Sequence, residues 1–210
     1  NTETVFLVSH FLFDGEIKRG CIYNNRSAAL IERVRNSMRI IYDLEPRVSE
    51  DPETGVLRIS YHNVALGLYM KEKAEELFEN IVRFSKHRKR EFLQSFFDDE
   101  GCMDFRPAEN LRRVRGYQKN IQVLYLIHRL LDDFDIRSKI RQPNEIVISG
   151  KENLLKFQKE INFSPGVRIN GKRSNSIWKR PLEKREILRR AIASYKPIGS
   201  NGVHRSTYVH

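Results

Sequence analysis

A ten-residue segment occurs twice in the chain, and this repeat constrains the fold more than any other feature of the sequence. Residues 6–15 read FLVSHFLFDG and residues 92–101 read FLQSFFDDEG, so both follow the pattern Phe-Leu-x-Ser-x-Phe-x-x-acid-Gly. Apolar residues at positions i, i+1 and i+5 of both copies, and at i+4 of the second, predict a short buried helix, and the glycine after the acid lets the backbone leave it. Each copy therefore predicts a helix followed by a turn.

The segments that follow the two copies also correspond to one another. In each half we expect a hairpin, an amphipathic helix, a second hairpin and a closing helix. The expected hairpins span residues 16–24 and 47–61 in the first half and 102–118 and 136–149 in the second, and the amphipathic helices span 27–42 and 120–134. The order αββαββα thus occurs twice, which predicts an α+β protein that arose by internal duplication.

The same pattern sets the domain boundaries. We expect a first repeat over residues 1–84, a second over 85–195 and a flexible C-terminal tail over 196–210. Within the second repeat, residues 163–179 are rich in Gly, Ser, Asn, Lys and Arg and predict a basic loop, after which a last helix is expected over 182–195.

The charge balance favours a polyanionic partner. The chain has 38 Lys and Arg against 27 Asp and Glu, a net charge of +11, and such an excess is typical of nucleic-acid-binding proteins. A basic but otherwise ordinary protein has the same composition, so charge alone leaves both alternatives open. No apolar run reaches the roughly 18 residues of a membrane span, and no membrane association is expected.

Cysteine usage indicates a reducing compartment. Cys21 and Cys102 lie far apart without CxxC spacing, which predicts neither a disulfide framework nor a zinc site. We expect an intracellular protein, in the cytoplasm, the nucleoid or an organelle, that is not secreted.

The duplicated helix ending in acid-Gly, with its strands and helices, resembles the LAGLIDADG homing endonucleases in their single-chain, two-repeat form. Residues 92–101 are the closer match, and the likeness runs from Leu7 to about Tyr195. The family usually has Gly or Ala at the helix contact, where this chain has Ser9 and Ser95. These small side chains still permit the close helix packing along a pseudo-two-fold axis that the resemblance implies.

The resemblance also implies a shared metal centre. It places Asp14 and Glu100 at the ends of the two central helices, where both carboxylates reach the same cations, together with Gly15 and Gly101. Mg²⁺ prefers hard oxygen ligands, and two or three Mg²⁺ ions are expected, with Mn²⁺ able to substitute. An acid at a helix C-terminus is unfavourable to the helix dipole, which itself indicates a functional role. Asp98 and Asp99 compete with Glu100, but the alignment with Asp14 selects Glu100.

Two antiparallel four-stranded sheets would form a saddle for DNA, because a β-ribbon fits the major groove. Alternation in residues 113–115 and 137–141 puts basic side chains on one face of each strand, although a solvated sheet face has the same pattern. The residues predicted to contact DNA are Lys18, Arg19, Asn24, Asn25, Arg26, Arg47, Arg58, Arg106, Arg112, Arg113, Arg115, Gln118, Arg137, Lys139, Arg141, Lys172 and Arg173.

A basic or amide side chain near each metal would order the attacking water. Lys119 is the predicted residue in the second half, with Asn25 as its counterpart, and Lys71 or Lys73 is a further candidate; each lysine is equally interpretable as a surface charge. His10 is interpreted as a satisfied core residue rather than a catalyst. Trp178 either stacks on a base or anchors the tail.

The predicted function is therefore Mg²⁺-dependent hydrolysis of both strands of a long pseudo-palindromic or asymmetric DNA target by a monomeric homing endonuclease. One alternative keeps the fold without cleavage, as a DNA-binding protein or an RNA-splicing maturase. An intein nuclease is disfavoured because no splicing residues are found at the ends. A basic scaffolding protein is a third alternative, and it would bind DNA weakly and without the steep salt dependence of phosphate contacts.

Overall fold

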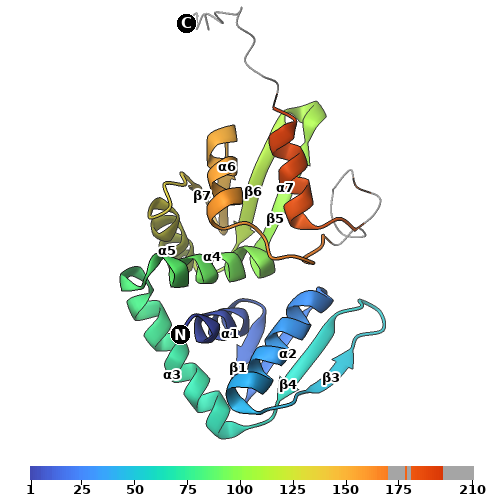
Figure 1. Ribbon diagram of the computed structural model, residues 1–210, viewed down its shortest axis with the longest axis vertical. Helices are drawn as coiled ribbons and strands as arrows, with labels where there is room; N and C mark the ends of the chain where they lie inside the picture. Colours follow the sequence, from blue (N-terminus) through green and yellow to red (C-terminus); the bar gives the residue numbers. More distant parts are fainter. Residues whose placement is uncertain (170–177, 179–180, 196–210) are drawn as a thin grey trace, which may run out of the picture.

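The computed structural model (Figure 1) describes residues 1–169, 178 and 181–195. The first half contains α1 (Thr2–Phe13), β1 (Gly15–Ile17), β2 (Cys21–Asn25), α2 (Ala28–Tyr42), β3 (Arg47–Glu50), β4 (Leu57–Tyr61) and α3 (Val64–Asn80). The second half contains α4 (Lys86–Glu100), β5 (Gly101–Arg106), β6 (Leu111–Tyr117), α5 (Ile121–Asp132), β7 (Lys139–Arg141), β8 (Glu145–Ser149), α6 (Lys151–Glu160) and α7 (Lys184–Ala193). The αββαββα order is present twice, as predicted.

Each half forms one antiparallel sheet of four strands. The strand orders are β1-β2-β4-β3 and β5-β6-β8-β7, so the two sheets have the same topology. Gly15 pairs with Tyr23 in the first sheet and Gly101 pairs with Gly116 in the second. Because Gly15 and Gly101 are equivalent in the sequence repeat, this register also makes Tyr23 and Gly116 equivalent. The α+β fold with two duplicated sheets is therefore confirmed.

The helix α2 shows how local sequence sets an element. Its N-cap Ser27 accepts a hydrogen bond from the backbone N–H of Leu30, and Asp43 ends it in the left-handed conformation. The buried side chains Leu30, Val34 and Met38 recur at helical spacing on one face, which packs into the core of the first half.

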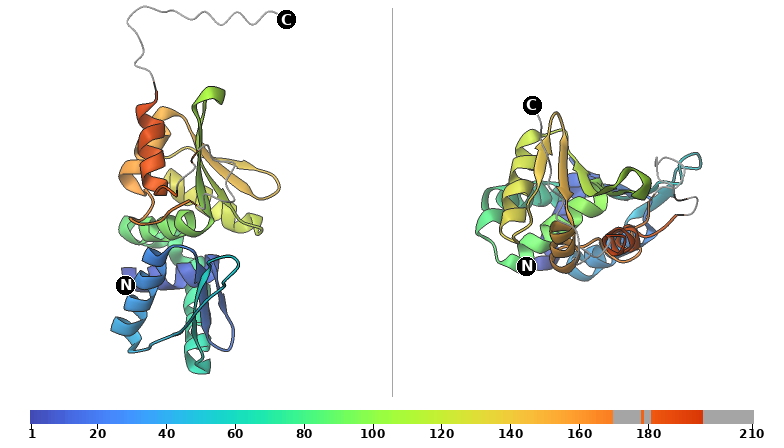
Figure 2. Two further views of the ribbon diagram at one scale, coloured as in Figure 1. Left: turned by 90° about the vertical axis from the view of Figure 1, so that its right-hand side faces the viewer. Right: turned by 90° about the horizontal axis from the view of Figure 1, so that it is seen from above.

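The two motif helices meet at the centre of the molecule. Figures 1 and 2 show α1 and α4 where the halves join, with the strands of each half extending away from this junction. The Phe13 ring lies 5.4 Å from the Phe92 ring and 5.3 Å from the Phe96 ring, between centroids, so α1 and α4 pack directly. Ser9 and Ser95 are both buried. The acids that end these helices are thereby brought together.

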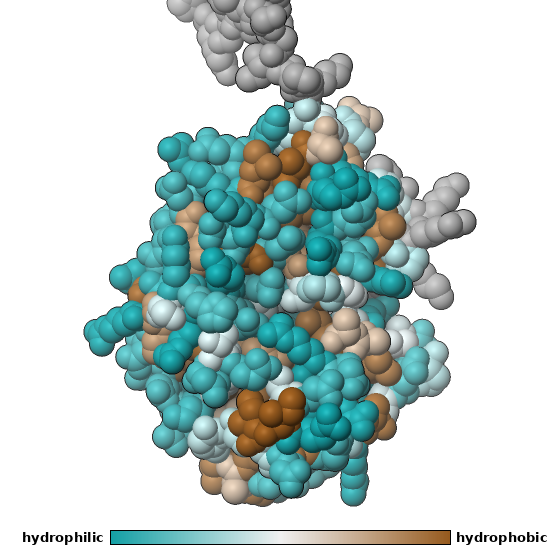
Figure 3. Space-filling model, in the orientation of Figure 1, coloured by the Kyte–Doolittle hydropathy of each residue, from teal (hydrophilic) through white to brown (hydrophobic). Residues whose placement is uncertain are grey.

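Outside this core the molecule is mostly polar. The face drawn in Figure 3 is largely hydrophilic, with separate apolar areas, in keeping with a chain of which 31% is charged. Among the described residues, no helix has the length and apolar character that a membrane span requires.

Candidate metal centre and nucleic-acid interface

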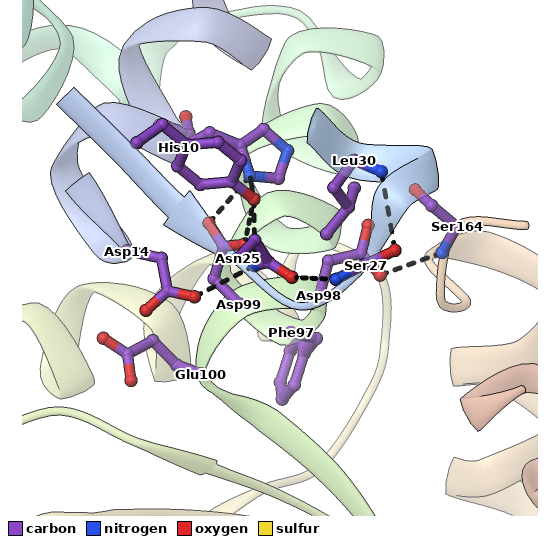
Figure 4. A network of polar contacts seen from close by, with 12 residues as sticks. His10, Asp14, Asn25, Ser27, Leu30, Phe97, Asp98, Asp99, Glu100 and Ser164 are labelled. Carbon is purple, nitrogen blue, oxygen red and sulfur yellow. Dashed lines mark hydrogen bonds and ion pairs between the residues drawn. The ribbon is translucent and has the colours of Figure 1, made fainter. Parts of the chain in front are cut away.

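Asp14 and Glu100 lie side by side at the ends of the motif helices (Figure 4). Asp14 is the C-cap of α1 and Glu100 is the last residue of α4. Burial, followed by the charge of Asp99, raises the pKa of Asp14 to about 7. Burial, followed by the charges of Asp14 and Asp99, raises the pKa of Glu100 to about 7. Two partly buried carboxylates that disfavour each other's charge suit a divalent cation, which relieves the repulsion and prefers oxygen ligands.

The described residues do not form a ready-made metal cluster of three or more His, Cys, Asp or Glu side chains. The two carboxylates of Asp14 and Glu100 are the oxygen donors that the motif helices bring together (Figure 4). At Gly15 and Gly101 a side chain is excluded, because a Cβ would lie 2.5 Å from the Ile22 carbonyl oxygen and 2.3 Å from the Phe97 carbonyl oxygen, respectively. The backbone thus turns out of each helix directly beside the acid.

A buried polar network stands behind Asp14. Its centre is Asp99, whose carboxylate is 2.7 Å from His10 Nδ1 and accepts a 2.7 Å hydrogen bond from the Tyr23 hydroxyl. Asn25 Nδ2 donates to Asp14 at 2.9 Å and lies within 3.0 Å of the Tyr23 hydroxyl oxygen and 3.1 Å of Asp99 Oδ1. Asp14 is thereby positioned through Asn25 by residues of α1, β2 and α4.

An equivalent amide stands beside Glu100. Counting two residues on from the equivalent pair Tyr23 and Gly116 makes Gln118 the counterpart of Asn25. Gln118 Nε2 donates to Glu100 Oε1 at 3.4 Å, a longer contact than that of Asn25 with Asp14. The two amides also share a second contact, since each side-chain oxygen accepts the backbone N–H two residues later.

This register corrects the sequence prediction for Lys119. Lys119 was matched to Asn25, but that position belongs to Gln118, and Lys119 is exposed one residue further on. The error arose because the hairpin between β5 and β6 is longer than that between β1 and β2. The equivalent positions after the two hairpins were therefore matched one residue out of register.

Lys184 supplies a buried positive charge to the acids. Its ammonium group donates to the backbone carbonyls of Asp98 at 2.6 Å and Phe97 at 3.4 Å, the last turn of α4. A cation is favourable at the negative end of a helix dipole. The charge of Lys184 also lowers the pKa values of Asp14 and Glu100, although burial raises both of them by more. Burial in turn lowers the pKa of Lys184 itself.

Asp98 is a structural acid. Its side chain is buried and accepts a 2.9 Å hydrogen bond from the backbone N–H of Ser164, and burial raises its pKa to about 6. This contact fixes the chain after α6 against the end of α4.

A cleft of about 610 Å³ opens beside the acids between the two halves. Its lining contains Asp14 and Asp99 from the motif helices, Arg26 from the first half, and Arg106 and Arg115 from the second. An acidic floor with basic walls fits a phosphodiester backbone held against metal ions.

The sheets place many of the predicted DNA-contacting residues on their open faces, opposite the helices. Cross-strand partners share a face, so Asn24 and Arg58 lie together in the first sheet. In the second sheet the open face carries Arg113, Arg115, Lys139 and Arg141. The alternation that predicted one basic face is thus present in the register.

Two predicted site residues lie elsewhere. Arg112 occupies the opposite face of β6, where its guanidinium donates to Ser194 Oγ at 2.6 Å and covers the Tyr195 ring. It anchors the C-terminal end of the α7 region and is not available to DNA. Arg112 and Arg113 are consecutive on β6, so their side chains point to opposite faces of the sheet, and only one of them can share the open face with Arg115.

Lys73 is the second. It bonds Glu76 at 2.6 Å and lines a pocket with Asn1 and Thr4, at the N-terminal end of α1. Asp14 follows the other end of this 12-residue helix, roughly 18 Å away at the usual rise per residue. The predicted catalytic role of Lys73 is therefore not supported. Lys71 lies on α3, the helix that also carries Lys73, and is exposed.

The other residues predicted to contact DNA fall into two groups. Lys18, Arg19, Arg47 and Arg137 are exposed or half-buried around the strands, whereas Lys172 and Arg173 lie outside the described residues. Trp178 packs on Phe105 at 6.2 Å and under the Arg190 guanidinium at 5.2 Å, which favours the anchoring alternative.

Comparison with known proteins agrees with this geometry. A family model described as a LAGLIDADG-like domain matches residues 88–162. The structure of I-DmoI in complex with DNA and Mn superposes with a TM-score of 0.58 at 17% identity, covering 76% of this chain and 96% of that one. Residues 88–162 thus resemble a LAGLIDADG-like domain, and the chain as a whole shares the fold of I-DmoI.

A second LAGLIDADG relative shares the fold over a greater length. Full-length DUF199/WhiA from Thermatoga maritima superposes with a TM-score of 0.60 at 18% identity, covering 95% of this chain and 63% of that one. Its N-terminal LAGLIDADG domain gives 0.56 at 18% identity. A direct comparison with curated protein sequences gives no significant match. At these identities the structural likenesses establish the fold of this chain.

Proposed function

We propose that this protein is a site-specific DNA endonuclease that cuts both strands of a duplex with the help of divalent metal ions. The observation that carries the proposal is the meeting of Asp14 and Glu100 (Figure 4), each with its pKa raised to about 7, beside a cleft with basic walls that Asp14 lines. Two equivalent helices deliver one carboxylate each, which matches the two strands of a duplex.

The chain offers a defined set of donors. Asp14 and Glu100, with the carbonyl oxygens at Gly15 and Gly101, would hold Mg²⁺ or Mn²⁺. Such ions, when bound, activate water and stabilise charge on the attacked phosphate and the departing 3′ oxygen. The structures of I-DmoI with its target DNA contain Mn, Mg or Ca, which supports divalent ions as the cofactors to test.

The chain's own residues supply positioning. Asn25 and Gln118 each place an amide N–H on one acid, so their side chains hold the carboxylates and leave amide groups near the water. Lys184, which also lines the cleft, balances the negative charge of the last turn of α4 through its bond to the Asp98 carbonyl. The exposed basic residues of both sheets would bind the duplex on either side of the acids.

A second candidate is DNA binding without cleavage. The observation that favours it is internal compensation: Asn25 donates to Asp14, and the charge of Lys184 partly offsets the negative charge of both acids from within the chain. A protein of this kind would retain both carboxylates as structural groups and would bind duplex DNA through the same sheets.

Cleavage of a selected target separates the two candidates. Duplexes are recovered from a randomised pool by binding in Ca²⁺ and are then incubated with Mg²⁺ or Mn²⁺. We expect double-strand breaks with the unaltered protein, at least a roughly 1,000-fold slower reaction for Asp14→Asn and Glu100→Gln, and DNA affinity within a few-fold.

The matched control is Glu79→Gln, which removes one carboxylate from the exposed surface of α3. It should cleave normally. Binding of the selected duplex with no cleavage by the unaltered protein in either metal would select the non-cleaving alternative.

A further inference from the structure

The open face of the second sheet carries arginines that are organised around one acid. We define the arginine cluster as Asp104, Arg106, Arg113, Arg115 and Glu145. Asp104 Oδ2 accepts from Arg113 Nη2 at 2.9 Å and Nε at 3.1 Å, and from Arg115 Nη1 at 3.3 Å. Arg106 Nε lies 3.4 Å from Asp104 Oδ1, and Arg115 Nε also bonds Glu145.

The cluster is tightly held but not closed to the groove side. The Asp104 side chain is only 9% exposed, whereas those of Arg113 and Arg115 are 17% and 22% exposed. A guanidinium has five N–H groups in a rigid plane. The contacts with Asp104 and Glu145 use two on each of Arg113 and Arg115, so the others stay available.

The first sheet has no such organisation. Arg47 and Arg58 lie on its open face and are exposed. In the described part of the chain, neither is hydrogen-bonded or ion-paired to a carboxylate. The equivalent surfaces of the two halves thus carry exposed arginines without a carboxylate partner in one case and arginines bound to carboxylates in the other.

We infer that Asp104 is a specificity-determining residue, which holds Arg113 and Arg115 in the orientation that reads guanine in the half of the target bound by the second repeat. This inference rests on the proposed function. A fixed guanidinium suits guanine because its paired N–H groups match the O6 and N7 acceptors in the major groove. Ordering before binding removes part of the entropy cost that a free arginine side chain pays on contact.

The spacing of the two arginines predicts the spacing of the bases. Residues two apart on a strand face the same side and lie about 6.8 Å apart, close to the rise of about two base pairs. Two guanine preferences about two base pairs apart are therefore expected in the second half-site. The first half-site, approached by unpaired arginines, should show phosphate binding with weaker base preference.

Selection from a randomised duplex pool tests the inference, comparing the unaltered protein with Asp104→Asn. Asparagine keeps the shape and an acceptor oxygen but removes the charge that orders three guanidinium groups. We expect the unaltered protein to enrich guanine at two positions. Asp104→Asn should lose roughly 5- to 150-fold of that preference at each, with the other positions unchanged.

The matched control is Glu109→Gln. Glu109 is an exposed acid that bonds Arg106 at 3.2 Å in the turn between β5 and β6. Its substitution adds the same charge to the same hairpin without touching Arg113 or Arg115, and base preferences should stay as they are. Arg113→Lys, which keeps the charge but not the planar fork, should lose the preference at one of the two positions and retain the slope of affinity against salt.

The outcomes separate the inference from the proposed function. Unchanged base preferences in Asp104→Asn, with affinity altered equally for all sequences, would overturn the role of Asp104 even if the selected duplex is cleaved. Loss of the two guanine preferences without any cleavage by the unaltered protein would support that role and overturn only the endonuclease activity.

Discussion

The junction of α1 and α4 contains the same contact twice, once in apolar and once in polar form. The sequence repeat makes Phe13 equivalent to Asp99 and His10 equivalent to Phe96. On one side the Phe13 ring packs 5.3 Å from the Phe96 ring. On the other side Asp99 Oδ2 lies 2.7 Å from His10 Nδ1.

The neighbouring strands have changed with the helices. A Cβ at Gly116 would lie 2.5 Å from the Phe96 ring, so that ring occupies the space that a side chain at position 116 would need. At the equivalent position Tyr23 keeps its side chain and bonds Asp99. A duplicated scaffold can therefore diverge by exchanging complementary groups across its axis. Here the apolar side stabilises the junction, and the polar side connects it to Asn25 and Asp14.

Removal of the central acid of the polar side should have the largest effect. Asp99→Ala leaves His10, the Tyr23 hydroxyl and Asn25 without their shared acceptor in a site where the Asp99 side chain is 0% exposed. We expect the free energy of unfolding to fall by about 3–5 kcal/mol, measured by urea denaturation. That loss would equal the roughly 3–5 kcal/mol expected for Phe13→Ala on the apolar side. A loss below about 1 kcal/mol for Asp99→Ala would break the comparison.

The second largest effect should be a pH dependence of stability caused by Asp14 and Glu100. The pKa values of Asp14 and Glu100 in the folded protein, about 7, lie above the ordinary 3.8 and 4.5. Groups with raised pKa values stabilise the fold at low pH, and this contribution is lost as the pH rises through 7. Without divalent ions, the free energy of unfolding should therefore fall from about pH 4 to about pH 7, by about 3–5 kcal/mol after allowance for solvent screening of these partly exposed groups, and level off above that.

Urea denaturation in EDTA at several pH values measures this slope. Asp14→Asn and Glu100→Gln should each flatten it, and added Mg²⁺ should reduce it in the unaltered protein. If the slope in Asp14→Asn and in Glu100→Gln is as steep as in the unaltered protein, the raised pKa values of these two acids are wrong.

A smaller effect is expected from a single hydroxyl of the polar side. Tyr23→Phe removes a donor to Asp99 and an acceptor for Asn25, and should cost about 1–2 kcal/mol of folding free energy. Tyr61→Phe is the control, because the buried Tyr61 hydroxyl has no hydrogen-bond partner among the described residues. Equal melting temperatures for the two variants would show that the network around Tyr23 adds no stability.

The smallest effect should come from the amide on the other side. Gln118 makes a 3.4 Å contact with Glu100, whereas Asn25 makes shorter contacts with three groups. Gln118→Ala should cost under about 0.5 kcal/mol and Asn25→Ala about 1–1.5 kcal/mol. Thermal unfolding of the two variants measures the difference, and a reversed order would contradict the assignment of the tighter network to the first half.

The helices, strands and central acids could be predicted because each leaves a local trace. The repeat of residues 6–15 in 92–101, with its helical spacing and the segments that follow each copy, was enough to predict the αββαββα order, and the family resemblance that it carries implied that Asp14 and Glu100 meet. Alternation along β6 correctly put Arg113 and Arg115 on one face.

The groups around the acids could not be predicted, because their partners are distant in sequence. Lys184 reaches α4 from a helix that begins more than eighty residues later, and no local pattern marks that contact. The alignment of the two repeats did match His10 with Phe96 and Phe13 with Asp99. At each of these two positions one repeat has a polar residue and the other an aromatic one, and this was the available sign that His10 contacts Asp99 and Phe13 contacts Phe96. Loop length displaced the counterpart of Asn25 by one position, which only the strand register resolves.

The place of Lys184 in the chain bears on how the protein is made. During synthesis both motif helices and all eight strands leave the ribosome before this lysine does. Until then the end of α4 carries several acidic groups without their internal cation. A chain that ends before Lys184 would accordingly have both four-stranded sheets but lack the cation that balances the end of α4.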